Sequence, residues 1–170
     1  MASNTPNLVL RKPDPSDLVN VLTDLGNNFD KLDAVHNVWT SYTPVWGSTS
    51  TAPGIGNGTI TGRYKKNGKD LDLRVMVTMG TTTTYGAAAW TISLPPGLVV
   101  AAGPRVVLPA MFNLASSFHG VAYNDAGATA LFLLIDNGTA GGSLQFPTGA
   151  VPAAWANGHN FAFGGRLEVA

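Results

Sequence analysis

Five large apolar residues near the N-terminus are spaced for a helix that packs against other helices. They follow one another at intervals of 4, 3, 4 and 3 residues: Leu18, Leu22, Leu25, Phe29 and Leu32. This is a heptad pattern, with the first, third and fifth residues at position d and the other two at position a. His36 falls at the next a position. The spacing predicts a coiled-coil stalk helix over residues 14–36, with these six side chains as its oligomerisation seam.

The predicted helix has a marked start and a weak interior. Asp14 suits the N-cap, Pro15 suits the first helical position, and Asp17 favours the positive end of the helix dipole. Gly26 costs about 1 kcal/mol relative to alanine, and a helix this short is marginal alone. It therefore needs partner helices, and the alternative is an amphipathic helix lying on the chain's own β domain. Leucine at d does not by itself select the number of partners.

After Trp39, apolar and polar residues alternate with a period of two, which predicts strands. The clearest hairpin joins residues 59–66 to residues 69–79 through Asn67-Gly68, a pair that favours a type I′ turn. Seven further strands are predicted, at residues 88–94, 98–102, 105–111, 118–124, 128–135, 143–146 and 161–169. Short strands separated by Gly, Pro and Asn turns predict a mainly β chain, with a jelly-roll-like β-sandwich head over residues 37–170.

Charge is balanced in sum but unevenly distributed. The formal net charge is zero, which argues against nucleic acid as the partner. Residues 75–170 contain only five charged side chains: Arg105, Asp125, Asp136, Arg166 and Glu168. So little charge predicts that part of the head surface is buried between subunits. No apolar run approaches the roughly 18 residues of a membrane span, so membrane insertion is not expected.

The sequence offers little catalytic chemistry. It has no cysteine, and its three histidines, His36, His119 and His159, lack the spacing of metal ligands. No nucleophile elbow is present, and paired carboxylates for glycoside hydrolysis are scarce. We therefore expect no catalytic residues, no metal, no cofactor and no enzymatic activity. A carbohydrate esterase or depolymerase on a β scaffold is the remote alternative.

A basic cluster surrounds the predicted hairpin and has two interpretations. Its members are Arg63, Lys65, Lys66, Lys69 and Arg74. With Tyr64 interleaved, it suggests a face for an anionic ligand or nucleic acid. Asp70 and Asp72 interrupt it, however, which favours charge pairing across the strands and lysines that protect a sheet edge.

Residues 1–13 are predicted to form an extended arm. Leu8, Val9 and Leu10 make a short apolar patch before Arg11 and Lys12. Such an arm can anchor the protein on a neighbouring protein of a particle, or it can pack back on the stalk. The sequence leaves both alternatives open.

Several short motifs together resemble structural proteins of tailed bacteriophages, especially phages of actinobacteria. They are the runs at residues 42–46, 53 and 56–64, the Thr-rich turn at 81–86, the strand at 90–95, the ending at 152–168, and the stalk at 13–32. The resemblance is to minor tail proteins, fibre-like proteins and head-decorating proteins, and it covers most of the chain. Its motifs are structural and do not mark a catalytic site.

The resemblance implies a homotrimer on the outer surface of a virion, with a parallel three-helix stalk and three jelly-roll heads around the axis. The arm would hold it to a phage capsid or tail protein. The chain is nearly all head, which favours a short knob over a long fibre. In one version the head attaches to a host cell-surface glycan through Tyr85, Trp90 and Trp155. In the alternative it is a capsid decoration protein that stabilises the capsid surface.

Overall fold

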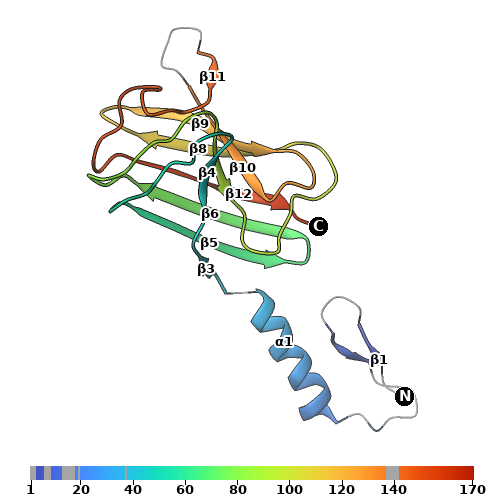
Figure 1. Cartoon of the computed structure of the whole chain (residues 1–170). Coiled ribbons are helices and arrows are strands. Elements are labelled where there is room, and N and C mark those ends of the chain that lie inside the picture. Colours follow the sequence, from blue (N-terminus) through green and yellow to red (C-terminus); the bar gives the residue numbers. More distant parts are fainter. Residues whose placement is uncertain (1–2, 6–8, 13–17, 19, 37, 137–141) are drawn as a thin grey trace.

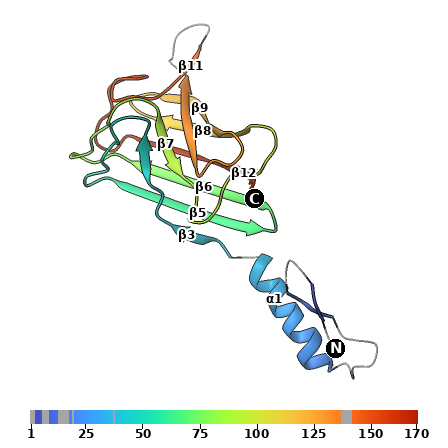
Figure 2. The same ribbon diagram turned by 45° about the vertical axis from the view of Figure 1, so that its right-hand side comes forward.

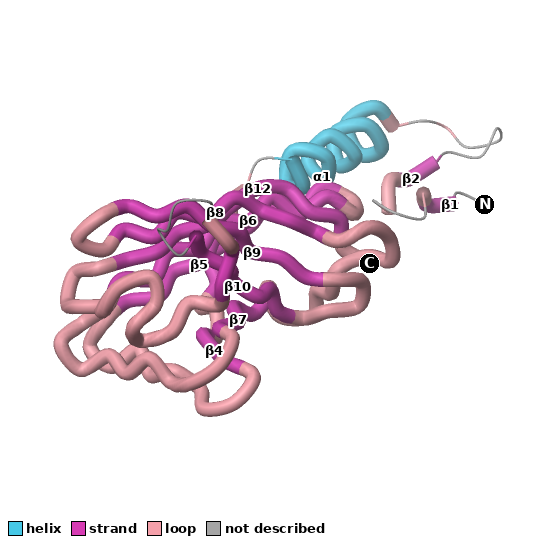
Figure 3. Tube along the Cα trace, turned by 90° about the horizontal axis from the view of Figure 1, so that it is seen from above, coloured by secondary structure: helices cyan, strands magenta, loops and turns pink. Residues whose placement is uncertain are grey.

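The chain divides into an N-terminal hairpin, a helix and a β head (residues 38–170), as Figure 1 shows. This computed structural model describes all of the 170 residues except 1–2, 6–8, 13–17, 19, 37 and 137–141. The fold is mainly β with one short helix, which confirms the mainly β part of the predicted fold class. Figure 3 shows that strands and their loops make up the head, while the helix lies outside it.

Within the described residues, ten strands form one antiparallel sheet. Nine follow one another across it in the order β3 (Thr40–Tyr42), β5 (Thr59–Asn67), β6 (Asp70–Thr78), β12 (Asn160–Glu168), β8 (Val106–Asn113), β9 (Ser117–Asn124), β10 (Ala130–Asp136), β7 (Trp90–Ser93) and β4 (Trp46–Ser48). The short strand β11 (Leu144–Gln145) pairs with β10 beside this path. Figure 1 shows β3, β5 and β6 along one side of the head and β8, β9 and β10 along the other.

The sheet curls because its two end strands are consecutive in the chain. Only residues 43–45 separate β3 from β4, although these strands lie at opposite ends of the strand order. Val45 and Ser93 bond reciprocally here: Ser93 N donates to the Val45 carbonyl at 3.0 Å, and Val45 N donates to Ser93 Oγ at 2.9 Å. The Tyr42 hydroxyl also donates to the Ser93 carbonyl. The Tyr42 bond links the β3 end of the sheet to β7, the neighbour of the end strand β4, while the Val45 bonds hold the connecting segment against β7.

The core lies inside the curl. On β6, β8, β10 and β12, successive side chains alternate between the inner and the outer face, and those on the inner face are apolar and buried. Trp90 on β7 and Phe161 on β12 stack with ring centroids 6.0 Å apart, although their strands are not neighbours in the sheet. The two sides of the sheet therefore meet through one continuous core.

Most predicted strands are present, and the differences have local causes. The segment at residues 98–102 forms no strand, and its only ladder contact among the described residues is a single bridge from Val100 to Val169. The strands β3 and β4 were not predicted, since three residues carry too little periodicity. The hairpin turn also differs: it consists of Gly68-Lys69, because Asn67 pairs with Asp70. Gly68 has φ 60° and Lys69 has no positive φ, which is the type II′ pattern and makes the type I′ prediction wrong.

The described helix begins later than predicted. A π-helical turn, η1 (Val21–Gly26), leads directly into α1 (Asn27–His36). Asn20 is the N-cap, and its side-chain oxygen accepts from Leu22 N and Thr23 N at 3.1 Å. Asn20 has an extended backbone, so the described helix starts directly after it. Asp14, Pro15 and Asp17 lie outside the described residues.

The helix projects from the head and does not lie along it, as both views in Figures 1 and 2 show. Beside it, β1 (Ser3–Asn4) and β2 (Arg11–Lys12) form a two-stranded N-terminal hairpin. Among the described residues, no helix is long and apolar enough to cross a membrane.

Candidate functional site

The predicted seam is exposed in the single chain. Leu22 is 87% exposed and Phe29 is 64% exposed, while Leu25 is exposed and Leu32 is half-buried. The β head therefore does not cover this stripe, and the alternative of a helix packed on its own β domain is not what the structure shows. Large apolar side chains in one exposed row are typical of a surface that packs on a partner.

Two seam positions differ from the expected pattern. Leu18 is exposed and precedes the helix, and His36 ends α1 with a side chain outside the described part. The π-helical turn also changes the angular spacing around Leu22 and Leu25, because its hydrogen bonds close over five residues. The described apolar stripe therefore consists of Leu22, Leu25, Phe29 and Leu32, which we call the helix stripe.

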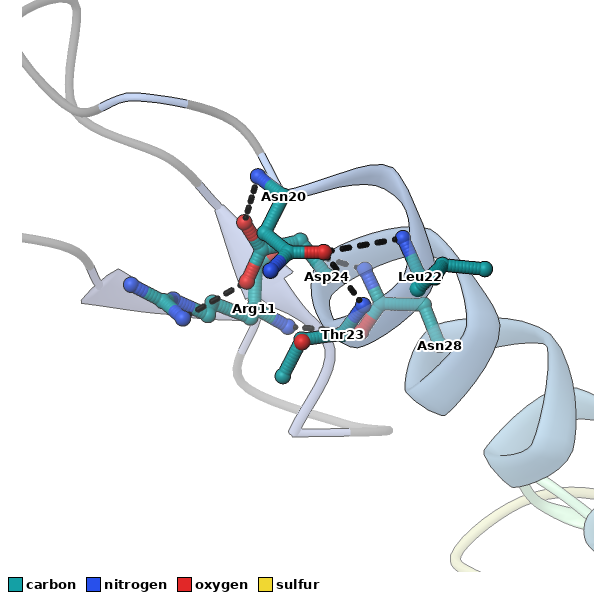
Figure 4. A network of polar contacts seen from close by, with 6 residues as sticks. All are labelled: Arg11, Asn20, Leu22, Thr23, Asp24 and Asn28. Carbon is teal, nitrogen blue, oxygen red and sulfur yellow. Dashed lines mark hydrogen bonds and ion pairs between the residues drawn. The ribbon is translucent and has the colours of Figure 1, made fainter.

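The arm packs back on the helix through polar contacts, which Figure 4 shows. Arg11 Nη1 lies 2.6 Å from Asp24 Oδ1, and the backbone N of Arg11 donates to Asn28 Oδ1 at 2.9 Å. Asn28 Nδ2 returns a bond to the Arg11 carbonyl at 3.1 Å. Lys31 Nζ donates to the Val9 carbonyl at 2.8 Å. Of the two alternatives for the arm, the structure shows the one in which it folds back on the stalk.

Folding back leaves part of the arm's apolar patch accessible. The Val9 side chain is 52% exposed, Leu10 is half-buried, and Leu8 lies outside the described residues. Asp24, by contrast, is buried, and it also accepts from Asn20 N at 2.9 Å. The arm thus covers the start of the helix while its predicted anchoring residue Val9 still faces solvent.

The three aromatic residues predicted to contact a ligand meet one another, but inside the core. Ring centroids of Trp90 and Trp155 are 5.4 Å apart, and Tyr85 lies 6.4 Å from each. Trp90 is 0% exposed and donates its indole N–H to the Tyr85 carbonyl at 2.9 Å, while Trp155 is buried and Tyr85 half-buried. We therefore assign Trp90 and Trp155 to core packing, because a buried ring cannot contact a ligand outside the folded sheet. Tyr85 packs against this core from its edge.

The outer face of the sheet carries an unpartnered apolar area. We call five of its side chains the outer strip: Val107, Met111, Val121, Tyr123 and Phe132. Val107 is opposite Tyr123, and Tyr123 is opposite Phe132, so the strip crosses β8, β9 and β10. Val107 is 56% exposed. A continuous apolar area of this kind on a sheet face indicates a protein contact.

An ion pair borders the outer strip. Arg105 Nε donates to Asp125 Oδ1 at 2.8 Å, and its guanidinium lies 5.2 Å from the Tyr123 ring centroid. The hydrogen bond from Arg105 lowers the pKa of the Asp125 carboxyl, although both side chains are exposed. Polar groups at the margin of an apolar area are typical of interface rims.

The other end of the outer face is basic and hollowed. In the sheet register Arg63 lies opposite Arg74, and Arg74 lies opposite Gly164. A groove of about 690 Å³ lies over this row, with Trp39 among its lining residues. The Arg74 guanidinium is 4.7 Å from the Trp39 ring centroid, and that of Arg63 is 6.0 Å away. This basic groove is a second candidate site.

Trp39 is the residue of this groove that sequence reasoning missed. It stands between the helix and β3, in no strand whose period would assign it to a face. The two arginines were identified, but only as part of a five-residue cluster. The register of β5 and β6 divides the members of that cluster between different places. Arg63 and Arg74 both line the groove, whereas Lys66 does not.

Among the described residues, no group of three His, Asp or Glu side chains lies close enough to hold a metal ion. Comparisons of the chain with protein-family models, with characterised proteins and with solved structures found no match.

Proposed function

We propose that this chain is a structural protein of a tailed-bacteriophage particle, a short oligomeric knob that acts by binding and not by catalysis. The observation that carries the proposal is the exposed helix stripe, with Leu22, Leu25 and Phe29 accessible beside a head whose core is complete without them. A helix this short and this exposed gains stability by association with copies of itself. The phage assignment rests on the sequence resemblance.

In this proposal the oligomer is a trimer. Three helices associate in parallel through the stripe as a short coiled coil, and three jelly-roll-like heads pack around the same axis. The outer strip supports head contacts, since Val107 and Met111 are exposed apolar side chains on one face of β8. The low charge of residues 75–170 fits such burial.

Attachment to a host cell-surface glycan is the first form of the proposal. Three identical weak sites on one rigid oligomer bind a repetitive surface far more tightly than one site does. The buried Trp90 and Trp155 do not serve this purpose, so the contact belongs to groups on the outer face.

Capsid decoration is the second form, and a different observation favours it. The exposed Val9 side chain of the arm offers an apolar contact to a neighbouring virion protein. In this form the knob bridges capsid or tail subunits, and its head needs no receptor.

The test uses particles that lack the protein. Purified full-length chain and a variant lacking residues 1–13 are incubated with such particles and, separately, with host cells. Binding of the full-length chain to particles supports the virion assignment, and its absence contradicts it. Loss of particle binding in the shortened variant, with its mass unchanged, supports anchoring by the arm. Binding to cells supports attachment, whereas binding to particles alone supports decoration.

A further inference from the structure

We propose that the basic groove binds an acidic saccharide, whose carboxylate or phosphate group is held by Arg63 and Arg74. This inference deepens the attachment form of the proposed function and rests on it for the source of the ligand. The groove itself is defined by the sheet register, by two arginines that have no acidic partner among the described residues, and by its size.

The two arginines lie opposite each other, and the repulsion between their charges destabilises the sheet. Arg63 and Arg74 are directly opposed residues of β5 and β6, and like charges in that arrangement destabilise a sheet. Among the described residues, neither makes an ion pair with a carboxylate. An anion bound between them removes the repulsion, which is a reason for such a pair to persist at a binding site.

The carboxylate beside them is already engaged. Asp72 lines the groove, but Arg166 holds it with two hydrogen bonds, from Nε at 3.1 Å and from Nη2 at 3.4 Å. Asp72 is therefore neutralised from the β12 side. The positive charge of Arg63 and Arg74 remains available to a ligand.

Trp39 orients the basic groups. With the Arg74 guanidinium 4.7 Å from its ring centroid, the indole restrains the plane of that side chain while leaving its N–H donors free. A planar guanidinium binds a carboxylate or phosphate with two parallel hydrogen bonds, and restraint before binding lowers the entropy lost. The groove is thus prepared for an oxyanion.

The floor of the groove suits a ring. Gly164 and Ala162 on β12 carry little or no side chain, and Met76 and Thr61 stand beside them. The volume of about 690 Å³ lies within the range of small-molecule sites. A sugar ring can place its C–H face on Ala162 and Met76 and a hydroxyl toward Thr61. The neighbouring cations Lys65 and Arg166 both lie opposite Asp72, and Arg166 bonds to it. The uncompensated positive charge is therefore short, which fits one saccharide acid better than a nucleic-acid backbone.

Titration calorimetry on the full-length protein at low ionic strength tests the proposal. The probes are glucuronate and glucose 6-phosphate, with glucose and inorganic phosphate as the neutral sugar and the bare anion. We expect one or both acidic sugars to bind at least tenfold more tightly than either control probe. The two acidic probes also separate a carboxylate source from a phosphate source. Equal binding of glucose, or equal binding of inorganic phosphate, would overturn the proposal.

Variants assign the binding to the groove. Arg63→Gln and Arg74→Gln should each weaken binding of the acidic sugar at least tenfold. Lys66→Gln removes the same charge from the same strand but outside the groove, and should change affinity less than twofold. Ala162→Leu should block binding without changing any charge. Unchanged affinity in both arginine variants would overturn the assignment.

A final control separates this groove from a contact between copies of the chain. The mass of each variant in solution is measured beside its affinity. Unchanged mass with lost binding supports the proposal, while a changed mass with retained binding means that a second copy occupies the groove and overturns it. Because mass and particle binding are separate measurements, failure of the groove leaves the structural role standing.

Discussion

Tyr42 and Ser93, 51 residues apart in the chain, join the two ends of the curled sheet: the tyrosine hydroxyl donates to the serine carbonyl at 3.2 Å. Tyr42 belongs to β3 and Ser93 to β7, next to the opposite end strand β4. Burial raises the pKa of the Tyr42 phenol above its ordinary value. The phenol that links the two ends of the sheet is therefore protonated, and able to donate this bond, at neutral pH.

Replacing Tyr42 by phenylalanine removes this bond and keeps the ring. We expect the free energy of unfolding to fall by about 1 kcal/mol at pH 7. Because the folded pKa is raised, the contribution is complete below the unfolded pKa near 10 and is lost as pH rises above it, by up to about 1.4 kcal/mol per pH unit. Urea unfolding between pH 7 and 11 should show the difference between the two proteins shrinking above pH 10. Tyr123→Phe, on the outer face, is the control, and a constant difference would contradict the account.

The hairpin turn gives a second prediction. Gly68 has φ 60° with nothing within 4 Å of an added Cβ, so a side chain there meets backbone strain alone. Gly68→Val should lower the free energy of unfolding by about 1–2 kcal/mol. Lys69→Val, in the same turn without a positive φ, should cost clearly less. Equal costs, measured by thermal unfolding, would argue against the type II′ assignment.

The sequence predicted features that depend on residues close together in the chain. It missed features that depend on contacts between distant segments. The alternation of Leu71, Leu73, Val75 and Val77 identified β6 and its inner face, because every second side chain is buried. Trp90 and Trp155 look like binding residues in loops or at strand starts, and only the curl of the sheet brings them into the core. The described helix starts at Val21 for a local reason that was not predicted, since the side chain of Asn20 caps it.

The basic groove was not predicted as a site for the same reason. Arg63 and Arg74 were visible as charges, but their pairing depends on a register set by the turn at Gly68. Trp39 joins them because the chain enters the head beside β5. Such placement comes from three-dimensional packing that a single sequence does not encode as a pattern.

The aromatic core gives a third prediction. Trp155 contacts Trp90, Phe112 and Phe161 with centroid distances between 5.4 and 6.3 Å. Trp155→Ala should therefore lower the free energy of unfolding by about 3–5 kcal/mol. Phe146→Ala removes an exposed aromatic ring and should cost under 1 kcal/mol. A small effect of Trp155→Ala in denaturant titrations would mean that this ring is not part of the core.

The arm gives a fourth prediction. Asp24 is buried and its carboxylate is paired with Arg11, so Arg11→Ala leaves a buried charge without its partner. We expect the arm to detach and residues 3–12 to become several-fold more sensitive to limited proteolysis. Lys12→Ala, an exposed change in the same strand, should leave the cleavage rate unchanged. Equal rates in all three proteins would show that the ion pair does not hold the arm.

The central claim is that the helix stripe joins copies of this chain, and the mass in solution tests it most directly. Light scattering at micromolar concentration should give about three times the 17.6 kDa of one chain. Leu25→Asp places a charge in the middle of the stripe and should reduce the mass to that of one chain. A control change, Asp33→Asn, alters an exposed helix residue outside the stripe and should keep the larger mass. A wild-type protein with the mass of a single chain, or an unchanged mass in Leu25→Asp, would contradict the account.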